Sequence, residues 1–414
     1  MPKETALMGW VKNRVLLSLV LAGIAAASGL AFLTHAPNRL VSGASISLAD
    51  VVSWGDGATQ ALALSASLMP ALLLVATIFM RPGRATHFLV IVTAVLLLSG
   101  LLWLAGGHAM RLASLPAAVS AGSSPGIERT SLGGAFWILI ALSWLAASDA
   151  IAHLGLKPLW RLIASAAVIT PLLVFIATGA LDQLSLMREY ANREDVFNAA
   201  LLQHVQIVVA SLLPSLLIGV PLGIVSARTG KWVNTLRPPL FASLNIIQTI
   251  PSIALFGLLM APLALLAASI PVLAKWGIKG IGLAPAVIAL ALYSLLPIVR
   301  STAAGISQVP RPVIDAAIGM GMTKRQIFWK VEAPMALPVF LSGLRVATVQ
   351  TIGMAVVAAL IGAGGFGAIV FQGLLGGALD LVLLGVLPVV AMAVAVDAAL
   401  QTIASSPANE FKFF

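Results

Sequence analysis

Long apolar runs separated by short polar stretches follow one another along the chain. Each run is about 20 residues long, which is enough for a helix to cross the hydrocarbon core of a bilayer. The runs do not alternate with a period of two, as barrel strands would, and a helix satisfies its own backbone groups in lipid. We therefore predict an all-α fold, a polytopic membrane bundle of about ten transmembrane helices. The predicted spans are roughly 15–34, 60–80, 88–105, 133–154, 161–181, 205–226, 240–263, 283–299, 337–360 and 381–403.

The composition excludes a soluble globular domain. Of the 414 residues, 60% are hydrophobic and 9% are charged, and the mean hydropathy is +1.05, whereas a soluble domain has about 25% charged residues. The net charge of +10 is typical of basic cytoplasmic loops in a membrane protein. We expect contact with membrane lipid and none with nucleic acid. The chain has no cysteine, and its five histidines lack paired ligand spacing, so we expect no disulfide and no metal site.

The basic residues also set the predicted orientation. With the first residues inside, 16 of the 24 lysines and arginines lie in inner segments, 7 lie in outer segments, and Arg345 lies within a span. This inner excess follows the positive-inside rule. The first apolar run is too long for the apolar region of a cleaved signal peptide, and no sharp cleavage site follows it. We therefore predict that 15–34 is a span and that both termini are cytoplasmic.

The stretch 182–200, DQLSLMREYANREDVFNAA, is the most charged external segment and indicates a short amphipathic linker. Five spans with few polar residues precede it, and five spans rich in proline, glycine and polar residues follow it. We therefore divide the chain into an accessory membrane region at 1–181, an external linker at 182–200 and a core at 201–405. In the first part, the segment 106–132 is rich in Ser, Gly and Ala and predicts an irregular external loop.

A polar, basic segment interrupts the apolar runs at 309–334 and predicts a cytoplasmic helical hairpin. Two prolines at 310 and 312 are typical of a first helical turn. Gly321 breaks the helix, and Thr323 is suited to cap a second piece. Lys324 and Arg325 lie opposite the apolar side of that piece, and Pro334 is predicted to end it.

This hairpin resembles the EAA loop of the permease subunits of ATP-binding-cassette (ABC) importers. In that pattern, Glu-Ala-Ala is followed after three residues by Gly, and after nine more by Ile-x-Leu-Pro. The matching positions here are Asp315-Ala316-Ala317, Gly321 and Val331-Glu332-Ala333-Pro334. The departures keep charge or apolar character. The resemblance implies that the hairpin docks on an ATPase subunit; the alternative is a surface hairpin with no partner. The implied coupling residues are Asp315, Ala316, Ala317, Gly321, Thr323, Lys324, Arg325 and Pro334.

The resemblance extends over about residues 200–403. Segments such as QTIPSIALFGLL (248–259) and ALIGAGGFGAIVFQGL (359–374) are similar to permeases of glycine betaine, choline and proline betaine importers. The first half is similar in length and hydropathy to the long Yeh-type permease. The resemblance implies a type I, MetI-like transmembrane domain in the C-terminal half and a place in the bacterial inner membrane. The implied partners are two ATP-binding subunits carrying ATP and Mg, a second permease copy or a shorter homologous permease, and a periplasmic substrate-binding protein.

Polar residues and prolines within two spans are candidates for the translocation path. Proline in a span frees a backbone carbonyl, which then needs a partner in a cavity or on a side chain. A structural kink is the alternative explanation. The candidates are Gln248, Pro251 and Ser252 in one span and Tyr293 and Pro297 in another.

Three glycines and one arginine complete the candidates for the path. The run at 362–367 matches G-x-G-x-x-G, but a dinucleotide site needs a preceding strand in a soluble unit, and here the flanks are spans. Gly362, Gly364 and Gly365 instead predict a helix break near the external face, with a gate or close helix packing as its role. Arg345 lies within a span, where an ionisable residue is a functional candidate unless its side chain reaches the interface.

The sequence contains no phosphate-binding Walker A loop, no nucleophile with a base and no metal cluster. We therefore expect a transport subunit that is not an enzyme, binds no cofactor itself and receives energy from a separate ATPase. The expected substrate is a quaternary-ammonium osmoprotectant such as glycine betaine or choline. An ion-coupled secondary transporter is the alternative, and it would need intramembrane carboxylates, for which Asp149 and Asp397 are the candidates. A membrane scaffold without transport is a third possibility.

Overall fold

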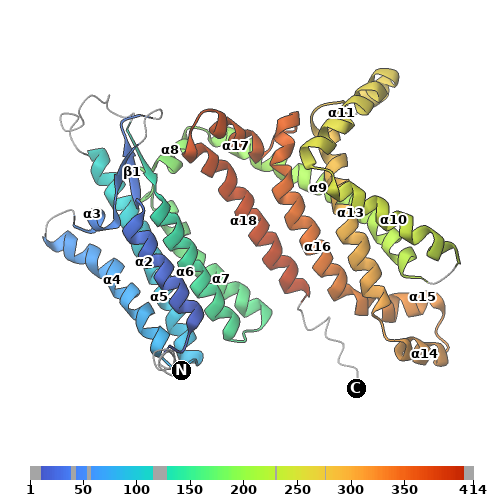
Figure 1. The fold of residues 1–414 in the computed structure, drawn as a ribbon, viewed down its shortest axis with the longest axis horizontal. Helices are drawn as coiled ribbons and strands as arrows, with labels where there is room; N and C mark the ends of the chain where they lie inside the picture. Colours follow the sequence, from blue (N-terminus) through green and yellow to red (C-terminus); the bar gives the residue numbers. More distant parts are fainter. Residues whose placement is uncertain are drawn as a thin grey trace, which may run out of the picture. The chain divides into compact units, whose positions relative to one another are not determined.

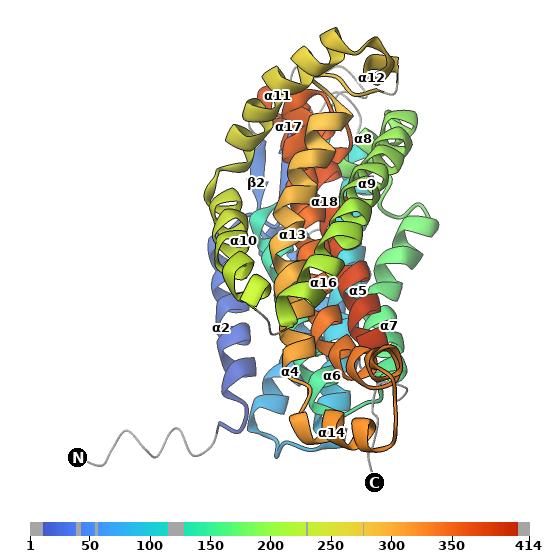
Figure 2. The same cartoon turned by 90° about the vertical axis from the view of Figure 1, so that its right-hand side faces the viewer.

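The computed structural model describes residues 11–38, 43–53, 57–114, 128–228, 231–275 and 277–404. The chain forms two compact units, Met1–Asn192 and Arg193–Phe414, each built mainly of long helices (Figures 1 and 2). The boundary between the units falls within 182–200, the segment predicted as a linker. The predicted end of the core at residue 405 lies just outside the described residues.

The N-terminal unit combines long helices with a small sheet and two short helices. Its long helices are α2 (Arg14–Gly29), α4 (Gly57–Phe79), α5 (Arg84–Ser114), α6 (Gly134–His153) and α7 (Pro158–Ala177). The short helices are α3 (Leu48–Ser53) and α8 (Ser185–Ala191), and the strands are β1 (Leu33–Ala36), β2 (Ala44–Ile46) and β3 (Arg129–Leu132).

The first predicted span, 15–34, is wrong at its C-terminal end. The helix α2 ends at Gly29, and the chain then enters β1, the central strand of a sheet in the order β2-β1-β3. Both pairs are antiparallel, with Leu33 opposite Ile46 on one side and Leu132 on the other. The 16 residues of α2 give a rise of about 24 Å. An apolar run does not by itself separate a helix from a buried strand.

Two polar segments of this unit are more ordered than predicted. The helix α5 continues to Ser114 and β3 begins at Arg129, so the predicted irregular loop 106–132 begins as helix and ends as strand. The rest of that loop, 115–127, lies outside the described residues. In the predicted linker, α8 is tied to β3 by an ion pair between Arg129 Nη1 and the buried Glu189 Oε1 at 2.6 Å.

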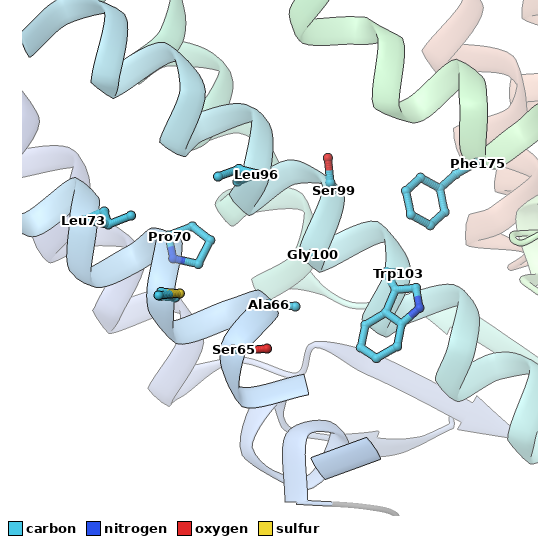
Figure 3. A pocket seen from close by; sticks show the side chains of 10 residues that line it. Ser65, Ala66, Pro70, Leu73, Leu96, Ser99, Gly100, Trp103 and Phe175 are labelled. Atoms are coloured by element: carbon cyan, nitrogen blue, oxygen red, sulfur yellow. The ribbon is translucent and has the colours of Figure 1, made fainter. Parts of the chain in front are cut away.

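A groove of about 450 Å³ opens between α4 and α5, with Phe175 of α7 at its far end (Figure 3). Pro70 has no N–H, so the carbonyl of Ala66, four residues earlier in α4, loses its helical donor. The backbone of Gly100 in α5 lies against that carbonyl, so that a Cβ at position 100 would collide with it. This contact forms the floor of the groove and fixes the closest approach of the two helices.

The C-terminal unit is a bundle of long helices connected by short ones. Its helices are α9 (Glu194–Ala227), α10 (Lys231–Thr249), α11 (Ser252–Ser269), α12 (Pro271–Lys275), α13 (Leu283–Ser307), α14 (Arg311–Gly319), α15 (Lys324–Ile327), α16 (Ala333–Ala355), α17 (Phe366–Leu375) and α18 (Leu379–Ala404). A π-helical turn, η1 (Phe328–Glu332), joins α15 to α16, and a 3₁₀ turn, η2 (Val357–Ile361), follows α16.

The helix α13 lies at the centre of this unit and packs against both α9 and α16 (Figure 2). Small residues allow the close approach. On the α9 side, a Cβ at Gly219 would lie 2.8 Å from Ile298, and one at Gly223 would lie 2.9 Å from the carbonyl of Val299. On the α16 side, Gly305 of α13 faces the carbonyl of Ala336.

Within the described residues, nine helices are long and apolar enough to cross a membrane. They match nine of the ten predicted spans in order, with two differences. The predicted span 240–263 is broken into α10 and α11 at Ile250 and Pro251. The predicted span 337–360 begins much earlier, because Lys324–Ala355 forms one continuous helical segment.

We expect Gly100→Val to lower the free energy of unfolding by about 1–3 kcal/mol, as overpacking does. The added atoms would collide with the Ala66 carbonyl, which is backbone and does not rotate away. Gly107→Val is the matched control, since it lies in the same helix with no neighbouring atom within 4 Å of its added Cβ. Thermal unfolding in detergent measures both variants, and equal stabilities would contradict this account of the groove floor.

Candidate functional site

The hairpin predicted from the sequence consists of α14, a turn at Gly321, and α15 with the π turn η1 that follows it. Gly321 has φ +74°, in the left-handed region. The Gly321 N–H donates to the carbonyl of Ile318 at 2.9 Å, and the Met322 N–H donates to that of Ala317 at 3.1 Å. This pair of bonds is the Schellman motif that ends helices at a glycine. The turn therefore depends on a residue without a side chain at position 321.

Thr323 caps the second piece, α15. The Gln326 backbone N–H donates to Thr323 Oγ1 at 3.4 Å, and the Thr323 N–H donates to Gln326 Oε1 at 2.8 Å. This reciprocal pair is a capping box. Thr323 was predicted from the sequence as a cap, whereas its partner Gln326, which stands at the spacing that a capping box requires, was not.

The prediction that Pro334 ends the hairpin is wrong, since the chain continues as α16 without a break. Pro334 is the second residue of α16, and because it has no N–H, one carbonyl of the preceding turn is left without a helical donor. The preceding π turn η1 leads the chain into it, with the Ala333 N–H bonded to the carbonyl of Phe328. The second arm of the hairpin is therefore rigidly continuous with a membrane-crossing helix.

The hairpin presents a mixed apolar and basic surface. Ala317 and Ile327 are buried and fasten it to the unit, whereas Asp315 and Ala316 are exposed. Three large apolar side chains are exposed as well, at 57% for Ile318, 71% for Met320 and 65% for Trp329. The exposed basic residues of the hairpin are Arg311, Lys324, Arg325 and Lys330.

An ion pair that the sequence did not reveal clamps the base of the hairpin to α9. Arg228, the residue after α9, donates from Nη1 and Nη2 to the two carboxylate oxygens of Glu332, both at 2.7 Å. Glu332 is buried, and the guanidinium also lies 5.9 Å from the centre of the Phe328 ring. Hydrogen bonding to the Glu332 carboxylate raises the pKa of Arg228 above its ordinary value, so the arginine stays charged. Bidentate pairing of this kind is strong and geometrically specific.

Four of the predicted path residues meet at the break between α10 and α11. The carbonyl of Tyr293 lacks its helical donor because Pro297 has no N–H, and Gln248 Nε2 donates to it at 2.9 Å. The Tyr293 hydroxyl donates in return to the carbonyl of Ile250, the residue before Pro251. Ser252, half-buried, begins α11 beside this cluster. The polar groups therefore satisfy the backbone where two helices are interrupted.

Arg345 forms an ion pair between two helices. Its guanidinium donates to Asp397 of α18, with Nη2 2.6 Å from Oδ2 and Nε bonded to Oδ1. Their side chains are 39% and 32% exposed, respectively. The sequence singled out each residue, but nothing in it indicated that they are partners. Arg345 does not reach the Gln248–Tyr293 cluster by any hydrogen bond or ion pair found among the described residues.

The glycine run forms a tight loop between η2 and α17, which we call the glycine loop (Gly362–Gly365). Gly362, Gly364 and Gly365 have φ values of +80°, +80° and +73°. The Gly282 N–H, just before α13, donates to the carbonyl of Ile361 at 2.7 Å and fixes one side of the loop. The loop and the hairpin lie at opposite ends of the C-terminal unit (Figure 1).

A multi-pass helical bundle with an exposed hairpin between two membrane-crossing helices is the architecture of a membrane permease. The chain belongs to the family of binding-protein-dependent transport system inner membrane components, whose family model matches residues 219–406. Residues 12–187 match the N-terminal domain of the ABC transporter permease YehY. The two matches fall in the two units of the structure.

Several permeases are similar to about half of this chain. The osmoprotectant import permease protein OsmW of Salmonella typhimurium is 40% identical over 195 residues, which are 47% of this chain and 84% of that protein. The choline transport system permease protein OpuBB of Bacillus subtilis is 36% identical over 195 residues, 47% of this chain and 81% of that protein. A structure of the inward-facing MetNI methionine ABC transporter is also similar. The alignment covers 51% of this chain and 96% of the matched chain of that structure, at a TM-score of 0.45 and 22% identity.

We expect Arg228→Ala to lower the free energy of unfolding by about 1–3 kcal/mol, because it leaves the buried Glu332 carboxylate without its donor. Arg325→Ala on α15 removes an exposed arginine and should change stability by less than about 0.5 kcal/mol. Unfolding in mixed micelles measures both. If the two variants were equally stable, the clamp would contribute nothing.

The pair of Arg345 and Asp397 is open to a double-mutant test. Arg345→Met should lower stability by about 2 kcal/mol, since it leaves a lone carboxylate between spanning helices. The double variant Arg345→Met, Asp397→Leu should regain most of that loss and keep transport. Loss of transport in a stably folded double variant would instead assign the pair to the translocation path.

Proposed function

We propose that this chain is the permease of an ATP-driven importer for a quaternary-ammonium osmoprotectant, with glycine betaine and choline as the first candidates. The observation that carries the proposal is the exposed hairpin formed by α14, α15 and η1, which lies between α13 and α16 of the permease half. The printed functions of the similar permeases, osmoprotectant import and choline transport, support the substrate class.

The hairpin is the docking element for a separate ATPase subunit. Its exposed Ile318, Met320 and Trp329 offer apolar area, and the same segment carries four exposed basic residues. Burial of exposed apolar side chains is the usual driving force of association, and basic residues steer an acidic partner. In this proposal the hairpin end faces the cytoplasm of a bacterium, in agreement with the positive-inside rule. ATP and Mg bind to the partner, and a second permease and a periplasmic binding protein complete the importer.

Force applied to the hairpin reaches the membrane helices by two routes. The first is covalent, since α15 and η1 continue directly into α16. The second is the Arg228–Glu332 ion pair, which joins the same base to the end of α9. Because α13 packs against both α9 and α16, a tilt of the hairpin moves three central helices together. The break at Pro251, bridged by Gln248 and Tyr293, is an interruption along the proposed path.

The ion-coupled alternative gains no support from its two carboxylates. Asp397 is neutralised by Arg345, and Asp149 lies 3.6 Å from His153 in the last turn of α6. A coupling carboxylate has to exchange protons or ions during the cycle, and each of these two carboxylates already has a side-chain partner.

The proposal is tested with Gly321→Asp, beside Gly319→Asp as its control. Both variants add the same charge to the same hairpin, and neither added Cβ meets an atom within 4 Å. Gly321 alone of the two has a positive φ, so its substitution strains the turn. Affinity purification with the partner ATPase and ATP-driven uptake of labelled choline or glycine betaine are measured. We expect at least a tenfold loss of uptake in Gly321→Asp and retention in Gly319→Asp. Unchanged uptake in both would refute the coupling role.

A further inference from the structure

Two adjacent residues of α9, Gln203 and His204, hold the opposite end of the C-terminal unit, and neither was a candidate from the sequence. Gln203 Oε1 accepts a hydrogen bond from the Gly365 N–H at 3.0 Å. His204 Nε2 lies 3.1 Å from the carbonyl of Ile352, in the last turn of α16. One residue therefore binds the glycine loop and the other binds the helix that leads into it.

The bond from His204 supplies a donor to the Ile352 carbonyl, which has lost its helical partner. The Val356 N–H, which would serve Ile352 in a regular α-helix, bonds to Gly353 at 3.3 Å as the helix tightens into η2. The freed Ile352 carbonyl is an acceptor, so His204 Nε2 carries the proton. His204 is fully buried. Its other nitrogen, Nδ1, has no hydrogen-bond partner among the described residues.

The shape of the loop fits the two side chains closely. A Cβ at Gly365 would lie 3.2 Å from His204 Nδ1, and one at Gly364 would collide with Gln203 Oε1. The buried ring of Phe366, which follows the loop, lies 5.6 Å from the ring of His204 and 5.2 Å edge-on to that of Phe197. The glycine loop and Phe366 thus pack against Phe197, Gln203 and His204 of α9.

We propose that Gln203 and His204 are positioning residues that latch the glycine loop in one conformation, and that the loop leaves this latch once in each transport cycle. The proposal rests on the proposed function for its second part. Positions 204 and 228 are 24 residues apart on α9, about 36 Å at 1.5 Å per residue. The latch and the Arg228–Glu332 clamp therefore hold the two ends of α16 on the same helix, and the hairpin can act on the loop through it.

The test compares variants that remove each bond with variants that keep it. Gln203→Met removes the acceptor, and Gln203→Glu keeps one. Gln206→Met makes the same change at another exposed position of α9. His204→Phe removes the donor, and His204→Gln restores an N–H near the place of Nε2. Hydrogen exchange of backbone amides 359–368 is measured on the full chain. We expect exchange to rise roughly tenfold in Gln203→Met and His204→Phe, as for loss of one hydrogen bond, and to stay near wild type in the others.

A second readout separates a latch from a purely structural bond. In the complex with its ATPase and binding protein, we expect Gln203→Met to hydrolyse ATP several-fold faster without substrate and to lose most stimulation by choline. Exchange like that of Gln206→Met, or unchanged stimulation despite faster exchange, would overturn the proposal. If the loop loosens and basal hydrolysis rises, yet wild type neither imports nor responds to choline or glycine betaine, the latch stands and the proposed substrate is refuted.

Discussion

The C-terminal unit depends on the way α9 holds α16 at both ends. At the hairpin end, the two nitrogens of Arg228 grip the carboxylate of Glu332 at 2.7 Å, just before α16 begins. At the other end, His204 bonds to Ile352 in the last turn of α16. Between these points α13 packs against both helices. Because packed helices are stiff and their interiors dense, we expect α9, α13 and α16 to move together, with the hairpin at one end of α16 and the glycine loop at the other.

A second constraint, the need of every backbone carbonyl in lipid for a donor, explains where the polar side chains lie. Pro297 frees the carbonyl of Tyr293, and Gln248 supplies an N–H. The end of α16 frees the carbonyl of Ile352, and His204 supplies one. These polar residues therefore lie where the helices are interrupted. This role and a role in transport are compatible, since an interrupted helix is also where a membrane bundle bends.

The sequence predicted features that depend on neighbouring residues and missed those that depend on distant ones. Gly321 and Thr323 could be placed because a Schellman turn and a capping box are local patterns, and the spans because a run of 20 apolar residues has few other uses. The strand β1 could not be separated from α2, since its pairing with β2 and β3 decides its form. Glu332 lies 104 residues from Arg228, and His204 lies 148 residues from Ile352. Such partners follow only from packing.

The contacts that hold the two ends of α16 differ in strength. This difference determines which end gives way first under load. The hairpin end has two charge-assisted bonds to a buried carboxylate, each stronger than a neutral one. The loop end has two bonds between neutral groups, one from His204 to the carbonyl of Ile352 and one from the Gly365 N–H to Gln203, each worth about 1 kcal/mol net. A displacement imposed at the hairpin is carried along stiff helices and is taken up where the bonds are weakest. The geometry therefore favours a hairpin that stays attached while the glycine loop opens.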